Sequence, residues 1–157
     1  GYVGSFYRIE NEVDIKRGYL AQTVAEKCGL NFKHIKDINF LTIEQMYNDL
    51  DLVMFCSLTE GNPYTAMEAM ANGIPVLGTD TGIFAKMINK NSGFLLPIEE
   101  DKFVESASKI IRKLIKNYND YKLSCVSAKM QSRMFDWSVF RHEWINYFLS
   151  INKSFKS

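Results

Sequence analysis

Between Gly1 and Pro97 the sequence alternates between short apolar runs and segments in which apolar residues recur at helical spacing. The apolar runs are almost continuous, as strands are when both faces of a parallel sheet are covered. The predicted strands are YVGSF (2–6), LNFKHI (30–35), DLVMFCS (51–57), PVLGT (75–79) and GFLLP (93–97). The predicted helices between them cover residues 13–28, 42–50, 63–72 and 83–89. This alternation favours a Rossmann-like α/β fold, in which helices cover both faces of a parallel sheet.

After Pro97 the pattern changes to helices alone. Apolar residues recur at helical spacing from Phe103 to Tyr118, with lysines and serines on the other face, which predicts a packing helix. A last helix is predicted to begin with Ser138 as its cap. The aromatic residues on roughly one face of it are Phe140, Trp144, Tyr147 and Phe148. We expect that face to be core or a docking surface.

Length and composition fit a single domain. The chain has 157 residues, of which 46% are apolar, enough for one sizeable core. Nineteen Lys and Arg against eighteen Asp and Glu give a net charge of +1, which offers no global case for nucleic-acid binding.

The three cysteines lie far apart and fit neither a disulfide framework nor a zinc site. No apolar run reaches the roughly 20 residues of a membrane span and no signal peptide opens the chain, so we expect a cytoplasmic protein.

The loop after the strand DLVMFCS has the features of an anion site. In an open parallel sheet, ligands bind beyond the carboxyl ends of the strands, and Glu60 lies at such a position. Gly61 lets the backbone turn closely, and Pro63 suits the first position of a helix. The amides that such a helix leaves unpaired are those of Tyr64, Thr65 and Ala66. Together with the helix dipole they favour a phosphate group.

Glu68 lies in the same helix, with seven residues between it and Glu60. Much of its surroundings is small or apolar, so this carboxylate is not expected to be mere surface decoration. It can accept hydrogen bonds from sugar hydroxyls in a bidentate way. On spacing alone, two solvated polar positions account for the pair equally well.

The residues around the two glutamates resemble the nucleotide-sugar half of retaining glycosyltransferases of the GT-B fold, in particular family 4. That family carries, in order, a glutamate, a glycine-containing loop, a glutamate in an EAMA helix, a G-x-P-V strand, a T-D-x-G loop and a G-x-L-x-P strand. The matching segments are TEGNPYTAMEAMANGIPVLGTDTG (59–82) and NSGFLLP (91–97). Further matches are GYVGSF (1–6) to the opening strand, residues 16–19 to the K-G loop, MYNDLDLVMFCS (46–57) to the Y-x-x-x-D helix and strand, and FDWSVF (135–140) to the entry of the last helix.

The resemblance implies roles for the matching residues. Glu60 corresponds to the glutamate near the donor sugar and the reacting carbon, and Glu68 to the glutamate that binds the ribose hydroxyls. Lys16 corresponds to the basic residue that neutralises the diphosphate. The loop that holds the transferred sugar and the diphosphate corresponds to Gly61, Asn62, Pro63, Tyr64 and Thr65. Thr79 and the residues after it are expected to line the nucleotide pocket beside Glu68.

The chain departs from the family pattern around its first strand. Many members have an arginine directly after the glycine that corresponds to Gly4, whereas this chain has Ser5; we expect both residues in the donor site. The second cation is then Arg8 or Arg17, and the sequence leaves both open. The family's K-G reads KRG here, which leaves the register of that loop open as well.

The resemblance covers only one half of a GT-B enzyme, because the N-terminal acceptor-binding domain has no counterpart. We therefore expect residues 1–157 to be a single donor-binding domain, followed at its end by helices. The predicted function is transfer of a glycosyl group from a UDP-, GDP- or ADP-sugar to a glycan or lipid-linked acceptor, with retention of configuration. An acceptor domain in the same or another chain would complete the cleft. The alternative is a non-catalytic nucleotide-sugar-binding or assembly module.

We expect no metal and no cofactor. Asp49 and Asp51 spell a D-x-D, but they precede their strand, at the end opposite the ligand face, so capping is the expected role. GTDTG (78–82) lacks the G-x-G-x-x-G spacing, which disfavours a Rossmann-type oxidoreductase.

The stretch KMQSRMFDW (129–137) is basic and aromatic. A solvated helix end is the preferred interpretation, and contact with a membrane or a lipid-linked acceptor is the alternative.

Overall fold

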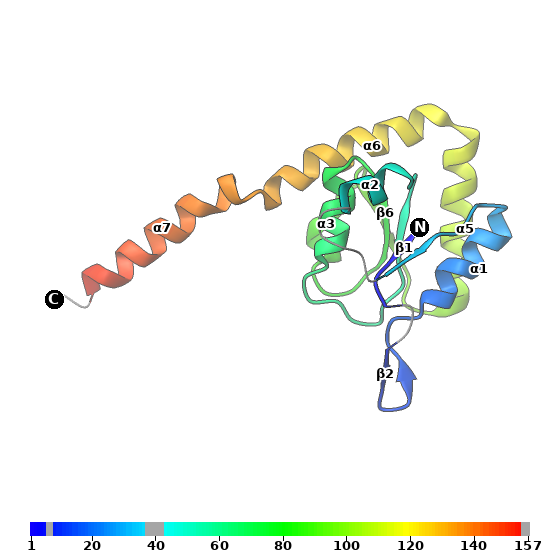
Figure 1. Ribbon diagram of the computed structural model, residues 1–157, viewed down its shortest axis with the longest axis horizontal. Coiled ribbons are helices and arrows are strands. Elements are labelled where there is room, and N and C mark those ends of the chain that lie inside the picture. Colours follow the sequence, from blue (N-terminus) through cyan, green and yellow to red (C-terminus); the bar gives the residue numbers. More distant parts are fainter. Residues whose placement is uncertain (6–7, 37–42, 155–157) are drawn as a thin grey trace.

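The computed structural model describes residues 1–5, 8–36 and 43–154 (Figure 1). Thr42, with which a helix was predicted to begin, lies outside this part of the chain. The helix that follows it is α2 (Ile43–Asn48).

The centre of the molecule is a parallel sheet, which confirms the predicted fold class. Its strands are β1 (Tyr2–Val3), β4 (His34–Ile35), β5 (Val53–Phe55), β6 (Val76–Thr79) and β7 (Gly93–Leu96). β1 pairs with β4, and β5, β6 and β7 pair in that order, all in parallel. The amide of Met54 donates to the carbonyl of Gly1 over 3.0 Å, which places β1 beside β5. The chain therefore leaves β1 toward β4 on one side and returns to β5 on the other, so a topological switch point lies between β1 and β5.

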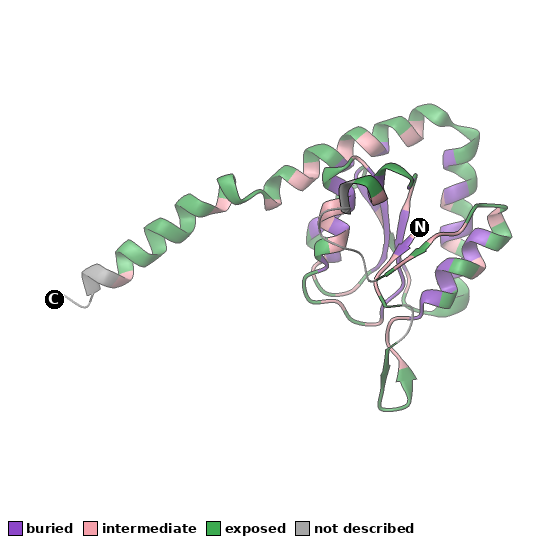
Figure 2. Cartoon of the chain, viewed as in Figure 1, coloured by how far each residue is buried: buried purple, intermediate pink, exposed green. Residues whose placement is uncertain are grey.

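Helices cover both faces of the sheet, and the alternation of side chains along β5 shows why. Val53 and Phe55 point into one core, whereas Met54 and Cys56 point into the other. The covering helices are α1 (Gly18–Cys28), α3 (Tyr64–Ala71), α4 (Phe84–Met87), α5 (Glu100–Lys116) and α6 (Tyr118–Ser132). α1 and α5 pack together over one face, and α3 and α6 pack together over the other. Figure 2 shows the buried residues gathered between these layers.

A hairpin replaces the predicted start of the first helix. Val13–Asp14 form β3, which pairs antiparallel with β2 (Ile9–Glu10), and the helix begins only at Gly18. Asn11 and Glu12 link the strands with φ of 48° and 66°, the left-handed conformation that a tight two-residue hairpin turn needs. The prediction was wrong because the apolar residues at the start of that segment also fit a helical period.

The C-terminal helices also differ in their boundaries. The predicted packing helix ends at Lys116, and Asn117 caps α6 by accepting from the amides of Asn119 and Asp120, so Tyr118 belongs to the next helix. A short 3₁₀ turn, η2 (Arg133–Phe135), then precedes α7 (Trp137–Ser154). The carboxylate of Asp136 accepts from the amide of Ser138 over 2.7 Å, so Asp136 and not Ser138 caps α7.

α7 projects away from the body of the molecule (Figures 1 and 2). Trp144 and Phe148 stack on one another with ring centroids 5.7 Å apart, and they are 49% and 60% exposed. The aromatic face is therefore not part of the core, and a docking surface is the expectation that stays open. Over the described residues, the helices lack the combination of length and hydropathy that crossing a bilayer demands.

Candidate functional site

A pocket of about 120 Å³ opens at the carboxyl ends of β1 and β5, beside the switch point of the sheet. The sequence-predicted residues that line it are Gly4, Ser5, Lys16, Glu60, Pro63 and Thr65. Those that do not line it are Arg17, Gly61, Asn62, Tyr64, Glu68 and Thr79. Sequence segments that lie far apart in the chain thus meet at one place, where an open parallel sheet binds its ligands.

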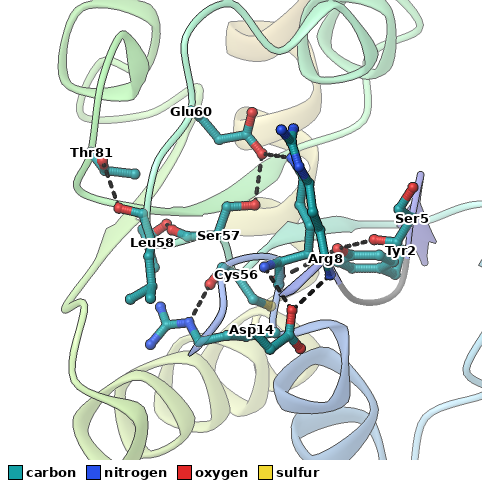
Figure 3. A network of polar contacts seen from close by, with 12 residues as sticks. Tyr2, Ser5, Arg8, Asp14, Cys56, Ser57, Leu58, Glu60 and Thr81 are labelled. Carbon is teal, nitrogen blue, oxygen red and sulfur yellow. Dashed lines mark hydrogen bonds and ion pairs between the residues drawn. The ribbon is translucent and has the colours of Figure 1, made fainter. Parts of the chain in front are cut away.

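Glu60 is the centre of a polar network in this pocket (Figure 3). Lys16 Nζ lies 2.5 Å from Glu60 Oε1, and Ser57 Oγ donates to the same oxygen over 2.6 Å. The side chains of Lys16 and Glu60 are 24% and 13% exposed, so the pair is partly withdrawn from water. None of the described residues hydrogen-bonds Oε2, so one oxygen of the carboxylate remains available to a ligand.

Asp14 organises the loop that presents Lys16. Its Oδ1 accepts from the backbone amides of Lys16, over 3.0 Å, and Arg8, over 2.9 Å. Sequence reasoning missed this residue, although an Asp two positions before a loop residue is the spacing of an Asx turn. The Tyr2 hydroxyl donates to the carbonyl of Ser5 over 2.9 Å and fixes the neighbouring loop (Figure 3).

The two candidate arginines occupy different places. Arg17 is 3% exposed; its Nε donates to the carbonyl of Cys56 over 2.8 Å and its Nη1 to that of Ile98 over 2.6 Å. Arg8 pairs with Glu10 on the exposed hairpin, at 2.6 Å. Arg17 therefore joins the end of β5 to the segment after β7, and Lys16 is the cation among the described residues that line the pocket.

Helix α3 begins one residue later than predicted. Pro63 is its N-cap and Tyr64 its first residue. The amide of Ala66 donates to the carbonyl of Pro63 over 3.0 Å, so the prediction that this amide is unpaired was wrong. The amides of Tyr64 and Thr65 precede the first hydrogen bond of the helix and remain the candidate anion donors.

The loop after β6 supports the Glu60 loop through two hydroxyls. Thr79 is fully buried, and its Oγ1 donates to the carbonyl of Ser57 over 2.5 Å. Thr81 Oγ1 donates to the carbonyl of Leu58 over 3.2 Å (Figure 3). In this arrangement both hydroxyls hold the protein backbone together, while the predicted contact of this loop with a nucleotide stays a prediction.

Gly82 lets the same two loops approach closely. Its φ is 57°, and a Cβ built on it would lie 1.7 Å from the carbonyl oxygen of Glu60. No side chain fits at that distance, so the glycine of the T-D-x-G loop is needed for the position of the glutamate backbone.

Glu68 lies outside the pocket lining, on the face of α3 that meets α2. The Tyr47 hydroxyl donates to Glu68 Oε2 over 2.8 Å, and Glu68 is half-buried. Burial, followed by this hydrogen bond and the charge of Glu68, raises the pKa of Tyr47 far above its ordinary value. Sequence reasoning gave Tyr47 no role, although it is the tyrosine of the Y-x-x-x-D segment.

The D-x-D segment makes ordinary protein contacts. Asp49 forms an ion pair with Lys33 at 2.9 Å rather than a cap, and the carbonyl of Asp51 accepts from the Tyr121 hydroxyl over 3.1 Å. In the described ranges, His, Cys, Asp and Glu side chains do not gather in a group of three or more that could hold a metal ion.

Comparison with known proteins gives a family and a fold. The family model described as glycosyl transferases group 1 matches residues 16–128. Among curated proteins, no significant match is found.

Several solved structures have the same fold at low sequence identity. Anabaena Alr3699/HepE in complex with UDP and glucose is 19% identical, with a TM-score of 0.74 over 95% of this chain and 48% of that one. The pneumococcal O-GlcNAc transferase GtfA, in complex with UDP and GlcNAc, is 16% identical, with a TM-score of 0.74 over 96% of this chain and 35% of that one. The C-terminal domain of a glycosyl transferase group 1 family protein (LpcC) from Francisella tularensis is 21% identical, with a TM-score of 0.55 over 72% and 58%. The chain spans between about a third and three fifths of the length of these proteins.

Proposed function

The chain belongs to the glycosyl transferases group 1 family, and from that premise we propose that it binds a nucleotide diphosphate sugar and donates the glycosyl group with retention of configuration. The observation that carries the proposal is the contact between Lys16 and Glu60 in a pocket at the carboxyl ends of β1 and β5. Both residues lie inside the matched segment. The resemblance of the surrounding motifs implies that Glu60 lies near the donor sugar and that Lys16 neutralises the diphosphate. The UDP and sugar bound to the Anabaena and pneumococcal proteins support this class of ligand.

The charges in the pocket suit a reaction in which a diphosphate leaves the anomeric carbon of a sugar. Positive charge develops at the anomeric carbon as the glycosidic bond breaks, and the carboxylate of Glu60 stabilises it. Negative charge grows on the leaving diphosphate, and Lys16 stabilises it together with the amides of Tyr64 and Thr65. An ammonium group has three donors, so Lys16 can contact phosphate oxygens while it remains beside Glu60.

The remaining predicted contacts form the rest of the donor site. Glu68 binds the ribose hydroxyls. Gly4 and Ser5, which line the pocket, and Gly61 and Asn62, which are exposed beside Glu60 in sequence, approach the diphosphate and the sugar.

We propose that no metal ion takes part, because a lysine and a helix N-terminus supply the positive charge that the leaving group needs. Donor binding and transfer should then be unchanged by EDTA, and a loss that added Mg²⁺ or Mn²⁺ restores would contradict this.

Transfer needs an acceptor beside the donor site, and we propose that an acceptor-binding domain forms the other side of the active-site cleft. The chain spans 48% and 35% of the Anabaena and pneumococcal proteins, so the remainder of each exceeds the part that matches. The exposed aromatic face of α7, with Trp144 and Phe148, supports docking of such a domain. Contact of residues 129–137 with a membrane is a separate prediction, and cosedimentation of the chain with anionic lipid vesicles would favour it.

Isothermal titration with UDP, GDP, ADP and their glucose conjugates tests the donor site. Glu68→Ala should weaken binding of every ligand with the preferred base by about 1–3 kcal/mol, because hydrogen bonds to a charged group are lost. Glu60→Ala should weaken the sugar conjugate more than the free nucleotide. Equal losses for both ligands in both variants would contradict these roles.

An assay of turnover separates the proposed enzyme from a binding module, because both are expected to bind the donor. Donor binding followed by release or transfer of the sugar once an acceptor domain is supplied supports the transferase, and NMR of the anomeric proton in the product tests retention. Donor binding without any turnover under that condition supports the non-catalytic alternative.

A further inference from the structure

Glu68 and the first turn of its helix share one hydrogen-bond donor. The Tyr47 hydroxyl lies 2.8 Å from Glu68 Oε2 and 3.2 Å from the carbonyl oxygen of Thr65. Tyr47 comes from α2, an element outside the loop and helix that carry the two glutamates. Tyr47 is 2% exposed and packs in the core with Ala66 and Met70, so the position of its hydroxyl is fixed by packing.

In both contacts the Tyr47 hydroxyl is the donor. Carboxylate and carbonyl oxygens only accept hydrogen bonds, so the two share the single proton of the Tyr47 hydroxyl, with the shorter contact to Glu68. The raised pKa of Tyr47 keeps that proton in place across the pH range in which proteins are studied. Tyr47 donates to Oε2 of Glu68, whereas none of the described residues donates to Oε1.

We propose that Tyr47 positions Glu68 for recognition of ribose, an inference that rests on the proposed function. The hydroxyl holds Oε2 and thereby leaves Oε1 oriented toward the hydroxyl groups of a bound nucleotide. Because the same hydroxyl also contacts Thr65, the carboxylate and the anion-binding end of α3 are fixed relative to each other. The ribose and the diphosphate of one nucleotide then meet a single rigid unit.

Tyr47→Phe tests this assignment, because it keeps the ring and removes only the hydroxyl. The ligands are UDP, 2′-deoxy-UDP and 3′-deoxy-UDP, or the corresponding GDP or ADP series if the wild-type chain prefers that base. Wild type should bind the ribonucleotide more tightly than at least one deoxy analogue. In Tyr47→Phe the ribonucleotide should bind roughly ten- to a hundredfold more weakly, the range of one hydrogen bond to a charged group, while that analogue is weakened less. The ratio between the two ligands therefore falls toward one.

A double-mutant cycle and a matched variant complete the test. In the Glu68→Ala background, Tyr47→Phe should have a much smaller effect on ribonucleotide affinity, since only the contact with Thr65 is left to lose. Tyr121→Phe removes a tyrosine hydroxyl that donates to the carbonyl of Asp51, at the other end of β5, and should leave the ratio unchanged. Circular dichroism establishes that each variant is folded.

The outcomes distinguish the two proposals. A wild-type chain that binds no nucleoside diphosphate overturns the proposed function and the inference with it. A wild type that discriminates against the deoxy analogue, with a Tyr47→Phe variant that discriminates equally, overturns the inference alone. Equal weakening of all three ligands in Tyr47→Phe also overturns it, because a purely structural role would act in that way.

Discussion

At the scale of single residues, Ser57 connects the carboxylate of Glu60 to the end of β6. Its hydroxyl donates to Glu60 Oε1, while its carbonyl accepts from the buried Thr79 hydroxyl. The orientation of Glu60 thus depends on a side chain that is itself 2% exposed and held by the next strand.

Ser57→Ala should therefore lower sugar transfer more than donor affinity. The lost hydrogen bond to a charged group is worth about 1.5–3 kcal/mol, so kcat/KM should fall by roughly ten- to a hundredfold. The affinity for the free nucleoside diphosphate should change little, since Lys16 keeps its contact. Kinetics with the acceptor domain present, together with titration of the free nucleotide, check both parts; a larger loss in nucleotide affinity than in kcat/KM would refute the assignment.

The buried thiol of Cys56 is expected to make the free energy of unfolding depend on pH above pH 9. Burial raises the pKa of its thiol to about 12 from an ordinary value of 9.0. Below pH 9 both folded and unfolded thiols keep their protons. Between pH 9 and 12 the unfolded chain loses the proton that the folded chain retains, so the free energy of unfolding falls by about 1.4 kcal/mol per pH unit for this group.

Urea unfolding at pH 7.5, 9 and 10.5 measures this slope, with Cys56→Ala as the comparison. The variant should lose stability less steeply above pH 9. Identical slopes in the two proteins would mean that Cys56 does not contribute.

The neighbours Lys16 and Arg17 show what sequence can resolve at this scale. The pattern predicted a cation in this loop, and the structure places Lys16 in the pocket beside Glu60. The sequence could not decide whether Arg8 or Arg17 is the second cation. Lys16 and Arg17 are adjacent but their side chains point in different directions, and the left-handed backbone of Arg17, at φ 49°, cannot be inferred from the residue type. Tyr47 and Asp14 were missed because their hydrogen bonds are set by tertiary or loop geometry.

At the scale of elements, the loop after β6 positions the loop after β5. Gly82→Ala should destabilise the protein by more than about 2 kcal/mol, because a left-handed backbone and a backbone clash act together. It should also weaken binding of the sugar nucleotide, since the Glu60 backbone has to move.

Thermal unfolding and titration measure these effects, and Gly61→Ala is the matched control for stability. No atom lies within 4 Å of a Cβ built on Gly61, and its φ is not in the left-handed region. A Gly82→Ala variant as stable as Gly61→Ala would argue against the close approach of the two loops.

The elements differ in how well the sequence predicted them. The parallel strands were predicted because short continuous apolar runs between helical segments are typical of strands buried on both faces. The β2–β3 hairpin was missed, since two-residue strands carry almost no periodic signal and neither Asn11 nor Glu12 is a glycine. The helix break at Asn117 was missed because apolar residues continue at helical spacing on both sides of it.

At the scale of the whole molecule, aromatic residues divide into a buried set in the body and an exposed set on α7. Phe148→Ala should change the free energy of unfolding by less than about 0.5 kcal/mol, whereas Phe103→Ala should cost about 3–5 kcal/mol. The two residues are 60% and 0% exposed, respectively. Urea unfolding of both variants checks the contrast, and similar losses would show that α7 packs on the body in solution.

The contact between Lys16 and Glu60 has a consequence for how quickly the pocket is found. Opposite charges 2.5 Å apart cancel at a distance, and the chain as a whole carries a net charge of only +1. An approaching anion therefore gains little long-range attraction from this pair or from the net charge. Capture depends on random encounter followed by short-range contacts, so the rate of donor association is nearly independent of ionic strength.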